Sequence, residues 1–211
     1  PYYNMYGPFY QIWLAREDRQ EAIAQVNRYK QYRSDKLNNL LNEVSLEDLK
    51  FEQDYRGQMS ITELALFESL DRSKQLLYLQ SAYNATVMSE DLYPPSATDP
   101  CSIYNGIGDA YRHALWNALC TVRLGETLTE QLTTAHEEKP FEYPLQSKEK
   151  QMDLYNNAKG RELASGAGLV WQLVKTALEN GELRYLTSLN SSSNPLERCR
   201  ATASSLLTPT N

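Results

Sequence analysis

The stretch from Asn105 to Leu124, NGIGDAYRHALWNALCTVRL, constrains the fold of this chain more than any other. Two glycines open it, and a run with good helix formers follows. Asp109, His113 and Asn117 are spaced four apart, so they share one face of a helix. A carboxylate, an imidazole and an amide are an unusual row beside alanines and leucines. We therefore expect a helix whose polar row meets polar partners from elsewhere in the chain.

Two later segments offer such partners. His136, the second of only two histidines in 211 residues, stands before Glu137 in the segment Ala-His-Glu. The segment MDLYNN then carries Asp153 and Asn157 four apart, although Asp and Asn are poor helix formers. Arg161 follows another four residues on. The sequence predicts a helical scaffold that brings the three segments together.

Converging segments of this kind suit a metal centre. Two histidines with one or two carboxylates are a sufficient set for a divalent ion such as zinc or manganese, with a position left open for water. No closely spaced ligand pair of the HExxH kind is present, so the ligands must come from distant segments. The predicted metal ligands are Asp109, His113, His136 and Asp153.

The same residues suggest a hydrolase that activates this water. The predicted catalytic residues are Asp109, His113, His136 and Glu137, the last as a proton acceptor. The predicted substrate-binding residues are Arg112, Asn117, Asn157 and Arg161. A phosphoester, lipid or envelope-derived substrate fits the two arginines, which can hold developing negative charge.

A second hypothesis explains the same residues without catalysis. Asp109 lies in the first turn of its helix, where a carboxylate favours the helix dipole. Buried polar side chains must be paired, so the motif residues can form a hydrogen-bond network that fixes the packing of a non-enzymatic interaction domain. A third hypothesis, a metal-free enzyme with His113 as base, lacks a clear nucleophile among the serines.

Helical signals dominate the rest of the chain. Capping boxes occur at Ser60–Glu63 and Thr127–Glu130, and no segment reads clearly as a strand. We expect an all-α fold, a single orthogonal helical bundle with a long N-terminal helical arm. The predicted helices cover about 12–44, 45–56, 61–70, 72–89, 105–124, 127–138, 147–165, 169–179 and a further turn or two in 182–189.

Three regions are expected along the chain. Residues 1–58 form an aromatic segment and helical arm, residues 59–190 a helical core domain with the motifs, and residues 191–211 a loosely attached tail rich in Ser, Asn and Thr. The three cysteines allow one disulfide with a spare thiol, or three thiols, and Cys120 suits a buried position.

Composition limits the partners. The net charge of −6 argues against general nucleic-acid binding, and no run approaches the roughly 20 apolar residues of a membrane span. The 15 tyrosines suit a protein partner at the Tyr-rich N-terminal region. That end lacks a signal-peptide pattern and an initiator Met, so we expect a processed or trimmed chain.

The three motifs together resemble an uncharacterised bacterial domain associated with secreted and toxin-like proteins. They are NGxxDAxRHAxWNA from Asn105, AHE from Ala135 and MDLxNNxxGR from Met152. The resemblance covers roughly residues 93–166 and implies a secreted or periplasmic bacterial protein. Tyr155 stands where many relatives are expected to have His, which weakens the case for metal binding if that His is a ligand.

Overall fold

The computed structural model describes residues 46–138, 146–194 and 197–211. The chain divides into two compact units, 1–57 and 58–211, and each is considered by itself. The predicted arm over residues 12–44 and the Tyr-rich N-terminal segment lie outside the described residues. The described part of the first unit is helix α3, Leu46–Arg56, in which Glu52 and Arg56 form an ion pair one turn apart at 3.6 Å.

The second unit is built from helices, and the all-α class is confirmed for the described residues. Its helices are α4 Ile61–Ser69, α5 Arg72–Leu92, α6 Ile107–Leu124, α7 Glu126–His136, α8 Gln146–Leu163 and α9 Val170–Glu179. Each falls on a predicted helix. The ends differ by up to three residues, the range over which frayed helix ends are commonly assigned.

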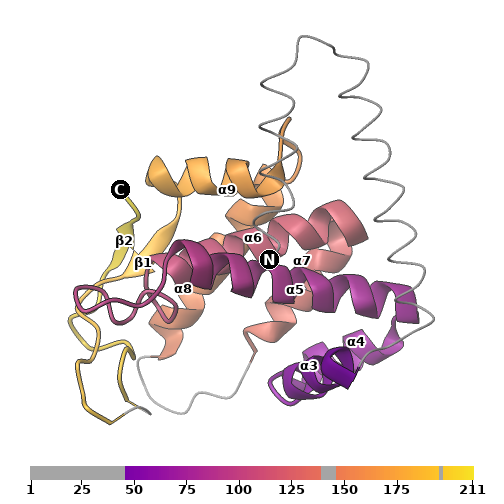
Figure 1. Cartoon of the computed structure of the whole chain (residues 1–211), viewed down its shortest axis with the longest axis horizontal. Helices are drawn as coiled ribbons and strands as arrows, with labels where there is room; N and C mark the ends of the chain where they lie inside the picture. The colour runs from indigo at the N-terminus through magenta and orange to yellow at the C-terminus, as the bar shows by residue number, and fades with distance from the viewer. Residues whose placement is uncertain (1–45, 139–145, 195–196) are drawn as a thin grey trace. The chain divides into compact units, whose positions relative to one another are not determined.

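Helix α6 lies at the centre of this unit and packs against α5, α7, α8 and α9 (Figure 1). Helix α6 carries three fully buried alanines, Ala110, Ala114 and Ala118. Their small side chains let the neighbouring helices approach. Helix α8 approaches α6 closely at Gly160, where a Cβ atom would stand 2.1 Å from the carbonyl oxygen of Ala114. This close approach brings the polar row of α6 against the polar face of α8.

Helix α4 begins at the predicted capping box. The Ser60 hydroxyl oxygen accepts a hydrogen bond from the amide of Glu63, and the Glu63 carboxylate accepts one from the amide of Ser60. The same Ser60 hydroxyl donates to the carbonyl of Ala135 at 2.6 Å, near the end of α7. The cap therefore joins the start of α4 to the end of α7.

The prediction of helical turns in residues 182–189 was wrong. Arg184–Leu186 is a short strand, β1, paired antiparallel with β2, Leu207–Pro209. The partner strand lies some twenty residues away in sequence, and its pairing overrides local propensity. Local periodicity carries no information on such a distant partner.

The described residues beyond Asn190 make several contacts with the rest of the second unit, and the expected loose tail stays a prediction. Cys199 forms a disulfide with Cys101, and Lys148 of α8 donates to three carbonyl groups, those of Thr202, Ala203 and Ser205. The third cysteine, Cys120, is a buried thiol. Burial raises the pKa of this thiol to about 12. The limits of the three predicted regions stay a prediction.

Across the described ranges, no helix is both long and apolar enough to cross a membrane.

Candidate metal centre

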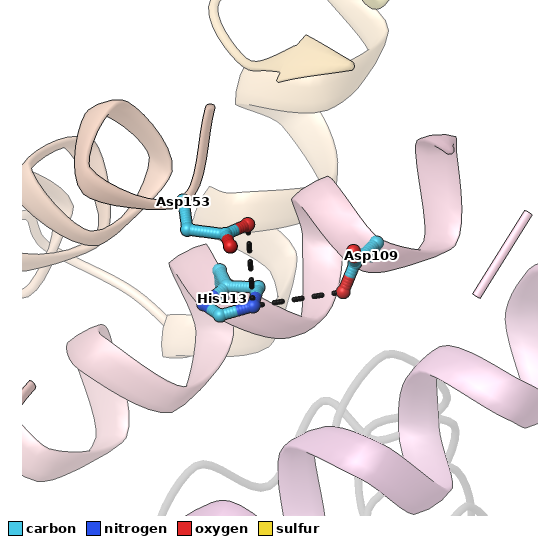
Figure 2. A group of neighbouring side chains, drawn as sticks. All are labelled: Asp109, His113 and Asp153. Carbon is cyan, nitrogen blue, oxygen red and sulfur yellow. Dashed lines mark ion pairs between the residues drawn. The ribbon is translucent and has the colours of Figure 1, made fainter. Parts of the chain in front are cut away.

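Helices α6 and α8 bring Asp109, His113 and Asp153 together (Figure 2). The His113 Nε2 atom lies 3.6 Å from Asp109 Oδ1 and 3.4 Å from Asp153 Oδ1. Ligands bound to zinc at about 2.0–2.1 Å and at tetrahedral angles stand about 3.4 Å apart. All three ligand atoms lie within 4.8 Å of one another, so these side chains could hold a metal ion.

The hydrogen bonds of His113 assign its tautomer. Arg112 Nη2 lies 2.9 Å from Nε2, and a guanidinium only donates, so Nε2 is the acceptor. Nδ1 then carries the proton and donates to Asn157 Oδ1 at 3.2 Å. Glu137 Oε1 lies on the same side of the ring, 3.7 Å from Nδ1. The lone pair of Nε2 thus faces the two aspartates, in the manner of a metal-binding histidine with its other nitrogen held by oxygen.

The loop that precedes α6 holds the Asp109 carboxylate through a hydrogen bond. Its Oδ2 atom accepts a hydrogen bond from the amide of Asn105 at 2.7 Å, which leaves Oδ1 toward His113 and Arg112. Asn105 has a φ of 65°, a left-handed conformation that Asn adopts more readily than most residues. Its side chain donates to Glu149 at 2.8 Å and to the carbonyl of Cys199 at 2.9 Å.

Asp153 is the least satisfied member of the group. Its side chain is 14% exposed, and its buried Oδ1 has no hydrogen-bond partner among the described residues. Burial, with the charges of Glu137 and Asp109, raises the pKa of Asp153 well above its ordinary value. A buried carboxylate oxygen of this kind costs stability unless a proton or a cation meets it.

Arg112 supplies the positive charge now present at the group. It contacts Asp109 Oδ1 as well as His113 Nε2, and its side chain is 28% exposed. Burial opposes its charge, but the attraction of Asp109 and Asp153 outweighs burial and raises its pKa. A metal ion bound to Nε2 would need the guanidinium to turn aside, toward the space that it already lines.

That space is a cavity of about 190 Å³. Its walls include Asp109, Arg112, His113, His136, Glu137 and Asp153. His113, His136 and Asp153, which come from three separate segments, therefore line one cavity. The volume suits a small polar group with a few waters, and it is below the range of drug-sized ligand sites.

His136 does not join the three-residue group. Its Nδ1 atom bonds to Glu63 Oε2 at 2.8 Å, and its ring packs edge-on against Trp116 at 5.0 Å between centroids. Trp116 also packs edge-on with His113, at 6.2 Å between the ring centroids. The assignment of His136 as a metal ligand stays a prediction.

Three of the predicted substrate-binding residues, Asn117, Asn157 and Arg161, are not among the residues that line the cavity. Asn117 donates to Asn157 at 2.7 Å and accepts from Thr133 at 2.8 Å and Arg161 at 3.2 Å. Asn157 in turn donates to Glu137 at 3.2 Å. These side chains form a buried network behind His113, as the second hypothesis expects, and their binding of substrate stays a prediction.

Sequence reasoning missed two residues near the cavity. Glu63 was visible only as the last residue of a capping box, and nothing in the sequence links it to His136. Glu149 is buried and accepts hydrogen bonds from Asn105 and from the amide of Ala201, both distant in sequence. Tyr155, at the position where His was expected, is 39% exposed and lies under the guanidinium of Arg184 at 4.7 Å. A histidine there would lie outside the lining of this cavity.

The comparisons with known proteins concern the same part of the chain. No curated protein and no solved structure matches it. A family model described as "Domain of unknown function (DUF6973)" matches residues 70–181, more than half of the chain. The match runs from α5 through α9 and includes Asp109, His113 and Asp153, while the bacterial and secreted origin expected above stays a prediction. The chain belongs to this family, whose members share the domain of unknown function DUF6973.

Proposed function

We propose that this domain binds a divalent cation, zinc or manganese, through Asp109, His113 and Asp153, and uses it to hydrolyse a phosphoester, lipid or envelope-derived substrate. One observation carries the proposal: His113 Nε2 lies 3.6 Å from Asp109 Oδ1 and 3.4 Å from Asp153 Oδ1, and this Asp153 oxygen is buried without a hydrogen bond in the described structure. The Arg112 guanidinium meets the charge at Asp109 Oδ1, whereas the buried Asp153 Oδ1 is left for a further cation.

The donor set decides the kind of cation. One imidazole nitrogen and two carboxylate oxygens suit Zn²⁺ or Mn²⁺ better than Cu⁺ or an iron–sulfur cluster, which prefer softer ligands. Three protein ligands leave at least one position for water. A divalent cation there would make that water a nucleophile near neutral pH.

The remaining residues of the cavity fit hydrolysis. Arg112, once turned away from His113, keeps its positive charge at the wall of the cavity and can meet negative charge on a substrate. Glu137 and Asn157 hold the Nδ1 side of His113 and keep its Nε2 in the acceptor state. The cavity volume of about 190 Å³ suits the reacting group of a substrate.

Calorimetric titration of the metal-free chain, residues 1–211, with Zn²⁺ and with Mn²⁺ tests the site. We expect one ion per chain, and loss of binding in Asp109→Asn, His113→Ala and Asp153→Asn. Glu162→Gln is the control, because it removes an equal charge from an exposed position of the same helix α8, outside the three-residue group. A folded wild-type chain that binds neither ion would overturn the proposal.

Hydrolysis needs a separate assay. p-Nitrophenyl phosphate, bis(p-nitrophenyl) phosphate and p-nitrophenyl acetate cover phosphomonoester, phosphodiester and carboxylic ester chemistry. We expect turnover of at least one probe that depends on the added cation, stops with a chelator and is lost in Asp153→Asn. Cation binding without turnover of any probe would leave a metal-binding domain and remove the hydrolase assignment.

The network gives the second candidate function, a non-enzymatic helical interaction domain. Its specific support is Asn117, which is fully buried and uses its amide nitrogen and its oxygen in two hydrogen bonds each. A network so complete stabilises helix packing without any ligand. If this is its only role, His113→Ala unfolds the chain at a lower temperature whether or not a cation is present.

A further inference from the structure

We propose that Glu149 is a positioning residue of the metal site, and that it holds the carboxylate of Asp109 in place through Asn105. This inference rests on the proposed function and adds the residue that decides where one carboxylate ligand stands. Glu149 is 6% exposed, lines the same cavity and precedes Asp153 by one turn of α8. Helix α8 therefore supplies one ligand directly and positions the other through Glu149.

Asn105 is the residue that contacts the ligand. Its backbone amide donates to Asp109 Oδ2 at 2.7 Å, and the other carboxylate oxygen, Oδ1, lies 3.6 Å from His113 Nε2. Because a carboxylate group is planar, a hydrogen bond that fixes Oδ2 also limits where Oδ1 can lie. The place of Oδ1 in the three-residue group therefore depends on the direction of the Asn105 amide.

The backbone of Asn105 is held in this direction by contacts outside α6. Its φ of 65° lies in the left-handed region, and its own amide and carbonyl make no helical hydrogen bond. The carbonyl accepts from the amide of Leu186 at 2.9 Å. The side-chain amide donates to Glu149 Oε1 at 2.8 Å and to the carbonyl of Cys199 at 2.9 Å, so both of its hydrogens are in use.

Glu149 is itself fixed by further donors. Its Oε1 atom also accepts a hydrogen bond from the amide of Ala201 at 2.7 Å, and its Oε2 atom accepts one from the Tyr104 hydroxyl at 3.4 Å. Burial and the charge of Glu149 raise the pKa of Tyr104 to about 12, so the phenol keeps the proton that it donates. A buried carboxylate with three donors around it can hold the Asn105 side chain in one position.

The oxygens of Glu149 are used differently from those of the ligand Asp153. Asp153 Oδ1 has no hydrogen-bond partner within the described residues, whereas Glu149 Oε1 already accepts two N–H groups. Glu149 is also outside the group whose ligand atoms lie within 4.8 Å of one another. These contacts favour a role in holding the loop before α6 over a role in binding the ion.

Glu149→Asp separates positioning from a simple effect of charge. The variant keeps the negative charge, but its side chain is one methylene shorter and cannot reach Asn105 and Ala201 in the same way. We expect Mn²⁺ to bind about 10–100-fold more weakly in calorimetry, the usual effect of losing a partner of a metal ligand. Glu162→Asp is the control, because it makes the same change at an exposed position of α8. Wild-type affinity in Glu149→Asp would overturn the inference.

Asn105→Gly tests the same link from its other end. Glycine keeps the backbone amide and adopts a φ of 65° freely, but it removes the side chain that contacts Glu149. This variant should also bind Mn²⁺ more weakly. Glu149→Asp added to Asn105→Gly should then change the affinity by less than about twofold, because the link is already broken. Fully additive losses would show that Glu149 acts independently of Asn105, which would refute the proposed link.

The amide proton of Asn105 reports the contact without any metal. Its hydrogen bond to Asp109 should slow its exchange with solvent in the metal-free chain, residues 1–211. In Glu149→Asp we expect about tenfold faster exchange at Asn105 by NMR, with wild-type rates at Ala114 in the middle of α6. Fast exchange of Asn105 in the wild type would contradict the inference before any variant is made. Equal acceleration at Asn105 and Ala114 would show a general loss of stability and would also contradict it.

The binding and exchange measurements distinguish this inference from the proposed function. If the wild type binds no Mn²⁺, the proposed function fails, while the exchange rates still decide whether Glu149 holds Asn105 and Asp109 in place. If the wild type binds Mn²⁺ and neither Glu149→Asp nor Asn105→Gly weakens binding, the proposed function stands and the positioning role of Glu149 is refuted.

Discussion

Asp153 illustrates how one residue can weaken the fold while serving a site. Its carboxylate is buried beside Glu137 and Asp109, and these surroundings raise its pKa. The folded state therefore binds the proton of Asp153 more tightly than the unfolded state does. As the pH rises from the unfolded value of about 3.9 toward the raised folded value, the metal-free protein loses stability.

Asp153→Asn removes this cost. We expect the metal-free variant to melt about 2–4 °C higher than the wild type at pH 7, the effect of roughly 1 kcal/mol in a chain of this size. Its advantage should shrink as the pH is lowered, because Asp153 is then protonated in the wild type too. Thermal melts of both proteins between pH 4 and pH 8 check this. A variant that is less stable than the wild type at every pH would contradict it.

Arg112→Gln should have the reverse effect. The guanidinium is the cation now in contact with Asp109 and His113, so its loss leaves the carboxylates of the cavity without their counter-charge. We expect a lower melting temperature without metal and about tenfold tighter binding of Mn²⁺, since a competing positive charge is gone. Thermal melts and calorimetry of the wild type and the variant check the expected changes in melting temperature and in Mn²⁺ affinity. Weaker Mn²⁺ binding would show that Arg112 does not compete for this position.

At the scale of elements, the contact between α6 and α8 decides whether the site exists. Gly160→Ala would place a methyl group against the backbone of Ala114, which cannot move aside as a side chain can. We expect a loss of about 2–3 kcal/mol in the free energy of unfolding, although Ala is the better helix former by about 1 kcal/mol. Urea denaturation measures the change.

Ala158→Ser, on the exposed side of α8, is the control for Gly160→Ala and should stay within about 0.5 kcal/mol of the wild type. The Gly160 variant should also bind Mn²⁺ more weakly, because separated helices move Asp153 away from His113. Tight binding with unchanged stability would mean that α6 and α8 tolerate a wider spacing than the structure has.

The elements were the most predictable part of this protein. Some helix ends follow local chemistry, since Ser60 and Asp71 cap α4 and α5. The capping box predicted at Thr127–Glu130 was wrong, because α7 begins at Glu126 directly after Gly125. The row Asp109, His113, Asn117 also follows from helical geometry alone. Helical geometry does not predict that this row has two different surroundings. Asn117 joins a buried network, whereas His113 and Asp109 face a cavity. Which neighbour each side chain meets depends on packing, and spacing along one helix cannot reveal it.

Contacts between distant segments account for what sequence reasoning missed. Glu63 and His136 are 73 residues apart, and the disulfide partners Cys101 and Cys199 are 98 apart. The number of cysteines alone does not determine which two of the three form the disulfide. The strand β1 was missed for the same reason, because its partner β2 follows only after a long connection.

At the scale of the molecule, the disulfide links the C-terminal segment to the loop that carries Asn105. Cys199 offers its carbonyl to Asn105, whose amide holds Asp109. Replacing Cys101 and Cys199 with Ser should lower the free energy of unfolding by about 4–5 kcal/mol, the value for a closed loop of near 100 residues. Because the Asn105 contact loosens with it, Mn²⁺ affinity should fall as well. Urea denaturation and calorimetry of the double variant measure both effects, with Cys120→Ser as the control for loss of a thiol. A destabilised double variant that keeps full Mn²⁺ affinity would show that the disulfide does not support the metal site.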